Sequence, residues 1–214
     1  MIARLPNLAR RCFVLAVVAA CFAVSAPIRG DSLEGPALIS SLRQGGYVIV
    51  MRHPSSPSTI PDKAQADPRN TKLERQLDDE GRKTAQEMGE AFRKLHIPVG
   101  DVLSSPTFRA TESVRLAKFG EPKTLAQLDD GGQSMQSNAD NERSTWLRKK
   151  VTESPRSGTN TVIVTHTPNL TGAFGQDAAG VAAGEALIFH PTGNKADLVA
   201  RLKIEEWPKL ARSP

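Results

Sequence analysis

Two histidines and two arginines have the residue types and the spacing that chemistry on a phosphoryl group requires. His53 and His166 each follow a run of apolar and β-branched residues, Arg52 precedes His53, and Arg109 follows a third, shorter apolar run. A neutral imidazole can attack phosphorus, a protonated one can donate a hydrogen bond, and a guanidinium group pairs bidentately with phosphate oxygens. We therefore predict that these four side chains converge on one pocket for a phosphorylated ligand.

The runs that precede these residues are typical of strands buried on both faces of a parallel sheet. They are Tyr47–Met51, Val102–Leu103 and Thr161–Thr165. Open α/β sheets bind their ligands at the carboxyl ends of the strands, where the polar residues of this chain gather. The strand pattern and the chemistry therefore predict the same edge of the sheet.

Helical patterns and proline-rich loops separate the strands. We expect helices over 38–43, 78–95, 105–118 and 142–151, a short helix after Pro168, two closing strands over 184–189 and 197–202, and irregular chain over 54–72 and 120–141. Ser105-Pro106 predicts a helix start with Ser105 as the N-cap residue. The alternation predicts a single α/β domain over 36–214, a three-layer α/β/α sandwich with a mostly parallel central sheet.

The first 26 residues have the pattern of a signal peptide. Arg10-Arg11 precedes the apolar run Phe13–Val24, and small residues up to Ala26 follow it. A run of about 12 residues is short for a membrane span and fits a signal-peptide core, so we expect export to the periplasm or the medium after cleavage near Ala26. The arginine pair also resembles a twin-arginine signal, and the residues before Cys21 resemble a loose lipobox. Membrane attachment is expected only if Cys21 is lipidated.

Charge and cysteine usage exclude several classes of function. The formal net charge is +5, but the first 30 residues hold four arginines and no acid, which leaves 28 − 4 = 24 basic against 23 acidic residues, a net of +1. This balance, with few aromatics, argues against a nucleic-acid partner. Both cysteines, Cys12 and Cys21, lie in the signal segment. The exported part would therefore have no disulfide, thiolate nucleophile or cysteine-ligated metal.

Five segments in a fixed order carry a resemblance to a known family. They are YVIVMRHP, LDDEGRKTAQEMGEAFRKL, VLSSPTFRATESV, VIVTHTPNL and GEALIF, within residues 46–190. With them the chain resembles the smaller branch of the histidine phosphatase superfamily, whose members have a phosphoglycerate mutase-like fold. The resemblance implies that His53 attacks phosphorus and is transiently phosphorylated. It implies that Arg52, Arg109 and His166 hold the phosphoryl oxygens, without a cofactor or a metal.

The chain departs from the family pattern at two points. Pro54 stands where the family has glycine, and proline removes a backbone N–H donor. The family also has an acidic residue after the second arginine, which protonates the leaving oxygen. We assign this role to Asp129, with Asp130 as the alternative, and expect Asn70 to supply a further phosphate contact.

Three functions remain open at this point. The first is a phosphomonoesterase acting on a small phosphorylated substrate. The second is a relative that binds phosphorylated or anionic ligands without turnover, and the third is a mutase, which export away from glycolytic substrates disfavours. A metal site at His53 and His166 lacks a third ligand at the right spacing. The sequence indicates no oligomeric state.

Overall fold

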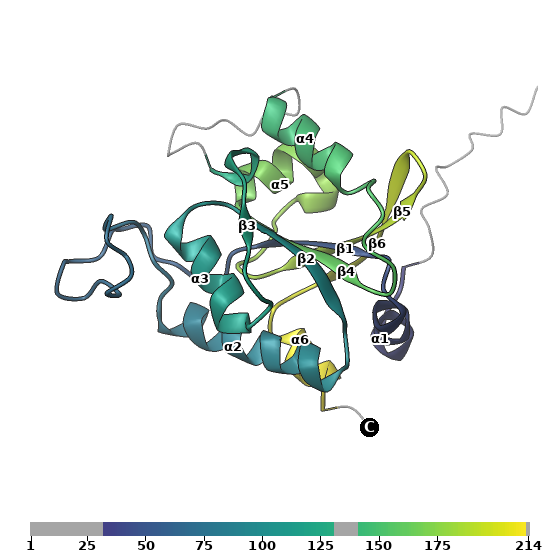
Figure 1. The fold of residues 1–214 in the computed structure, drawn as a ribbon, viewed down its shortest axis with the longest axis horizontal. Coiled ribbons are helices and arrows are strands. Elements are labelled where there is room, and N and C mark those ends of the chain that lie inside the picture. The colour runs from purple at the N-terminus through teal and green to yellow at the C-terminus, as the bar shows by residue number, and fades with distance from the viewer. Residues whose placement is uncertain (1–31, 131–140, 213–214) are drawn as a thin grey trace, which may run out of the picture.

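A computed structural model describes residues 32–130 and 141–212, which form one sheet flanked by helices (Figure 1). The predicted signal peptide lies outside these residues. The strands are β1 (Val48–Arg52), β2 (Val99–Ser104), β3 (Lys123–Thr124), β4 (Asn160–Thr165), β5 (Ala186–Thr192) and β6 (Lys195–Leu202). The helices are α1 (Gly35–Gln44), α2 (Asp79–Lys94), α3 (Phe108–Ala117), α4 (Glu142–Lys150), α5 (Thr167–Phe174) and α6 (Glu206–Leu210), with 3-10 turns η1 (Ala126–Leu128) and η2 (Gly175–Ala178).

The strand order is β3-β2-β4-β1-β5-β6. The first four are mutually parallel, while β5 pairs antiparallel with both β1 and β6. A mostly parallel sheet in a single α/β domain is what the sequence predicts, and the fold confirms it. No helix of the described chain combines the length and hydropathy needed to cross a membrane.

The alternation of side chains along β1 builds the two halves of the core. Ile49 and Met51 pack in the cluster that includes α2, α3 and α6, whereas Val48 and Val50 pack in the cluster that includes α4 and α5. Successive side chains of a strand point to opposite faces, so a continuous apolar run is required when both faces are covered. Figure 1 shows these helix groups on opposite sides of the sheet. The expected three layers are therefore present.

The loop after His53 is fastened to the start of α2. Asp78 caps this helix by accepting a hydrogen bond from the Gly81 amide at 2.7 Å, and the Ser55 hydroxyl donates to the same carboxylate at 2.6 Å. The Ser55 carbonyl approaches Gly81 so closely that an added Cβ would lie 2.1 Å from it. Glycine at 81 therefore allows the chain leaving His53 to lie against α2.

The start of α3 differs from the prediction. The helix begins at Phe108 with Thr107 at the N-cap position and no side-chain cap, so the assignment of Ser105 as N-cap is wrong. The Ser105 hydroxyl lies 2.8 Å from Nε2 of His166. The chain over 105–107 forms a turn that brings this hydroxyl to the imidazole, and α3 starts only after it. The structure also has β3, η1 and α6, which the sequence did not predict.

Candidate active site

The register of two neighbouring parallel strands places the two histidines side by side. Arg52 pairs with Thr165 at the ends of β1 and β4, and the His53 amide donates to the Thr165 carbonyl at 3.0 Å. The residues that follow these strand ends are His53 and His166. Their ring centroids lie 5.2 Å apart with an edge-on geometry, and they are only 5% and 2% exposed. The predicted convergence of the two histidines is therefore found.

The hydrogen bonds of His53 fix which ring nitrogen is free. Nδ1 lies 2.7 Å from the Pro54 carbonyl, and because a carbonyl only accepts, Nδ1 carries the proton. Nε2 is then unprotonated and faces Nε of Arg109 at 3.3 Å. Burial lowers the pKa of His53 to about 3, and the charges of Arg109 and Arg52 act in the same direction. His53 is therefore a neutral imidazole whose Nε2 lone pair accepts a hydrogen bond from Nε of Arg109.

Arg109 joins both histidines to a carboxylate. Its Nη2 lies 3.2 Å from Nδ1 of His166 and also pairs with the Asp130 carboxylate. Since a guanidinium only donates, Nδ1 of His166 accepts, and its Nε2 is the nitrogen that donates to Ser105. Burial, followed by the charge of Arg109, lowers the pKa of His166. One buried guanidinium therefore contacts both rings.

Arg52 lies at the end of β1 and is half-buried. Its Nη1 donates to the Val181 carbonyl at 3.2 Å, and its buried Nε has no hydrogen-bond partner among the described residues. Burial also lowers the pKa of Arg52. A desolvated guanidinium with an unpaired N–H favours the binding of an anionic ligand, because such a ligand supplies both a hydrogen-bond acceptor and a compensating negative charge.

Pro54 contributes its carbonyl to the site. That carbonyl fixes the His53 tautomer, and a residue of any type at position 54 could supply it. The amide donor that a glycine would offer is absent. Whether this lowers the affinity for phosphate stays a prediction.

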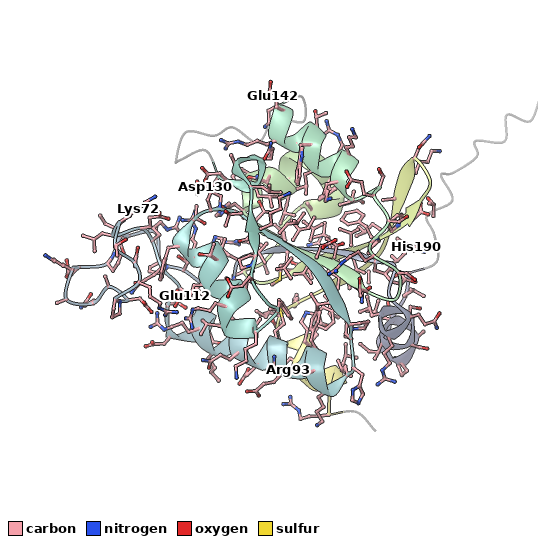
Figure 2. The ribbon with its side chains drawn as sticks, in the orientation of Figure 1. Lys72, Arg93, Glu112, Asp130, Glu142 and His190 are labelled. Carbon is pink, nitrogen blue, oxygen red and sulfur yellow. The ribbon has the colours of Figure 1, made fainter. Side chains whose placement is uncertain are left out.

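The two adjacent aspartates have different surroundings. The Asp130 carboxylate pairs with Arg109. Asp129 takes part through its backbone carbonyl, which accepts from Nη1 of Arg143 at 3.0 Å and from Nδ2 of Asn169 at 3.2 Å. Figure 2 shows Asp130 near the upper end of α3, where this helix starts. The structure thus brings Asp130 to Arg109, and the role assigned to Asp129 stays a prediction.

Asn70 is buried but bonds within its own loop. Its Nδ2 donates to the Glu74 carbonyl at 2.7 Å and its Oδ1 accepts from the Glu74 amide at 2.9 Å. The Glu74 carboxylate in turn accepts from the Phe108 amide at 2.8 Å, at the start of α3. Asn70 therefore orders the loop beside α3, and none of its hydrogen bonds reaches the two histidines.

Sequence reasoning missed Arg75. Its charge contributes to lowering the pKa of both His53 and His166, so the guanidinium lies within electrostatic reach of the site. Its Nε and Nη2 are anchored on the carbonyls of Pro57 and Ser56, at 2.7 and 3.2 Å. No strand end precedes Arg75 in the sequence, so the signal that identified Arg52 and Arg109 was missing.

The placement of possible metal ligands bears on what the site can hold. Among residues 32–130 and 141–212, no group of three or more His, Cys, Asp or Glu side chains is placed to bind a metal ion.

His190, interpreted from the sequence as an ordinary surface residue, is exposed with its ring 5.0 Å from that of Tyr47. Figure 2 shows it on the opposite side of the molecule from Asp130.

Comparison with known proteins defines the fold. No protein-family model and no curated protein matches the chain. The structure of the protein histidine phosphatase SixA complexed with tungstate is similar, with a TM-score of 0.54 at 13% identity, covering 75% of this chain and 98% of that one. A phosphoglycerate mutase from Bacillus anthracis str. Sterne has a TM-score of 0.49 at 12% identity, covering 81% and 100%. At 13% identity the likeness to SixA concerns the fold alone, and it agrees with the fold expected from the sequence.

Proposed function

We propose that this chain is a member of the histidine phosphatase superfamily that hydrolyses phosphomonoesters through a phosphohistidine on His53. One observation carries the proposal. The imidazole of His53 is neutral, its tautomer is fixed by the Pro54 carbonyl, and its unprotonated Nε2 accepts from the buried guanidinium of Arg109 beside a second histidine. A nucleophile with a phosphate-binding cation at its reacting atom is the arrangement that phosphoryl transfer requires.

The reaction follows from these contacts. Nε2 of His53 attacks phosphorus, a P–N bond forms, and the P–O bond to the leaving group breaks. Arg109, Arg52 and His166 stabilise the charge that develops on the phosphoryl oxygens. Water then attacks phosphorus and gives a proton to the carboxylate that protonated the leaving oxygen. The P–N bond breaks, its electron pair returns to Nε2, and orthophosphate leaves.

Asp130 is the carboxyl group best placed to protonate the leaving oxygen. Its carboxylate pairs with Nη2 of Arg109. A phosphoryl group that binds Arg109 replaces this carboxylate, and the negative charge of the ligand favours the protonated form of a carboxyl group beside it. Asp130 then takes up a proton and can donate it to the leaving oxygen. Asp129 is the alternative donor.

Hydrolysis of p-nitrophenyl phosphate by the purified protein tests the function. We expect His53→Ala to abolish it and His190→Ala, the exposed control, to leave it unchanged. Labelled phosphate trapped on the wild-type chain should be stable to base and labile to acid, as a phosphoramidate is. A wild-type protein without hydrolysis above background from pH 4 to 8 would overturn the proposal.

The second candidate is a protein that binds phosphorylated or anionic ligands without turnover. Two features favour it: Pro54 offers no amide donor, and Asp130 occupies a donor of Arg109. It predicts that vanadate or phosphate binds to the wild-type protein while no ester is hydrolysed. Calorimetry on the sample used for the assay separates the two functions.

We also propose that the chain is exported with removal of the first 26 residues. The basic, apolar and small-residue order of that segment supports this. Sequencing the N-terminus of the protein from an expressing bacterium should give a start near Pro27. A lipid-modified start at Cys21 would instead establish attachment to a membrane.

A further inference from the structure

We propose that Asn169 is a positioning residue that holds the Asp130 carboxyl at the leaving-group side of the site. This inference rests on the proposed function. Asn169 lies on α5. Its side-chain hydrogen bonds go to the chain segment that ends at Asp130, and none of those described goes to a histidine.

The segment before Asp130 is held through its backbone. The carbonyls of Gln127, Leu128 and Asp129 accept from side chains outside the segment, and the donors come from β4, α4 and α5. Thr165 Oγ1 donates to the Leu128 carbonyl at 2.8 Å. Asn169 Nδ2 donates to the carbonyls on either side of it, Gln127 and Asp129, both at 3.2 Å. One amide group therefore bridges the two carbonyls that flank Leu128.

Asn169 is buried although half of its side-chain amide lacks a hydrogen-bond partner, which indicates that its role is not packing alone. The residue is 0% exposed, and its Oδ1 has no hydrogen-bond partner among the described residues. A buried acceptor without a donor is unfavourable, and a leucine of similar size would avoid it. Only the NH₂ group of this side-chain amide is hydrogen-bonded, and both of its hydrogen bonds hold the segment that carries Asp130.

Loss of the bridge would act on proton transfer in particular. Without Nδ2, the Gln127 carbonyl loses the hydrogen bond that Asn169 donates to it, whereas the Asp129 carbonyl still accepts from Nη1 of Arg143. Leu128 stays anchored by Thr165 and by the core, so the fold is kept while the residues around it gain freedom. Proton donation requires hydrogen-bond reach to the leaving oxygen, so a small displacement of Asp130 slows it.

The test compares two leaving groups in Asn169→Ala and Asn169→Ser. A p-nitrophenolate ion leaves without a proton, whereas the alkoxide of glycerol phosphate needs one. We expect kcat for glycerol phosphate to fall about tenfold or more, with KM unchanged, and kcat for p-nitrophenyl phosphate to change by less than about threefold. In an Asp130→Asn background the effect of Asn169→Ala should disappear, because the group that it positions is gone.

Asn160 supplies a matched control. It is also 0% exposed and its Nδ2 also bridges two carbonyls, those of Leu42 and Pro98, at the other end of β4. Asn160→Ala should lower the midpoint of thermal unfolding and affect both substrates equally. An equal loss with both substrates in Asn169→Ser, or a loss that persists with Asp130→Asn, would overturn the inference. Absence of hydrolysis by the wild type would instead contradict the proposed function.

Discussion

At the scale of single residues, the site is organised by Arg109. Its guanidinium contacts the unprotonated Nε2 of His53, the unprotonated Nδ1 of His166 and the Asp130 carboxylate. Burial, together with the charge of Arg109, lowers the pKa of both histidines. In the proposed reaction a phosphoryl oxygen takes the position of this carboxylate, so ligand binding would be an exchange of anions on one guanidinium.

This exchange predicts opposite effects of Asp130→Asn on binding and on catalysis. The neutral amide competes less for Arg109, so vanadate should inhibit p-nitrophenyl phosphate hydrolysis at concentrations several-fold lower than in the wild type. Hydrolysis of glycerol phosphate should slow by about 10²-fold because the proton donor is lost. The control is Asp129→Asn, and a larger slowing in that variant would assign the proton donor to Asp129.

The buried imidazole of His53 also predicts how stability depends on pH. Its pKa is lowered to about 3 in the folded chain, against an ordinary value of 6.5. Between these pH values the unfolded chain binds more protons than the folded chain. The free energy of unfolding therefore rises with pH across this window, and this contribution to stability is lost as the pH falls. The urea midpoint of the wild type should therefore drop from pH 7 to pH 4.5. In His53→Gln the drop should be smaller; an equal drop would show that His53 is not the group responsible.

At the scale of elements, strand ends and a helix junction bring the site together. β1 and β4 end in register, which places the two histidines, and the turn after β2 places Ser105 against His166 before α3 starts. The loop that follows His53 is held on α2 by Ser55, Asp78 and the close approach at Gly81. The orientation of His53 therefore depends on the packing of α2.

Gly81→Ala tests this dependence. The added Cβ would lie 2.1 Å from the Ser55 carbonyl, so the loop or the helix must move. We expect a loss of about 1–3 kcal/mol in the free energy of unfolding and a reduced kcat, because the chain leaving His53 shifts. Urea denaturation and the p-nitrophenyl phosphate assay measure the two effects. Gln86→Ala, an exposed position on the same helix, should change neither.

At the scale of the whole molecule, the site lies on one edge of a sheet whose two faces are covered by separate clusters of apolar side chains. The carboxy-terminal helix α6 closes one of them, with Trp207 fully buried and its ring 4.5 Å from that of Phe92. This contact belongs to the α2 layer and lies among residues that take no part in the site. Stability and catalysis should therefore separate at α6.

Trp207→Ala is expected to reduce the free energy of unfolding by about 3–5 kcal/mol, as large truncations in a core do. The kcat of the molecules that remain folded should be close to that of the wild type. Urea denaturation and an assay normalised to the folded fraction at low temperature provide the measurements. A loss of kcat in fully folded protein would show that α6 transmits to the site.

The fold class and the convergence of the two histidines with Arg109 could be predicted from the sequence, because buried parallel strands need continuous apolar runs and their carboxyl ends converge. It did not predict β3 or α6, which are too short for a periodic pattern. The folded structure was needed to identify the tautomers of the histidines, the pairing of Asp130 with Arg109, the nearby charge of Arg75 and the bridge made by Asn169. Each of these depends on contacts between segments distant in the chain, and residue type and local spacing carry no record of such contacts.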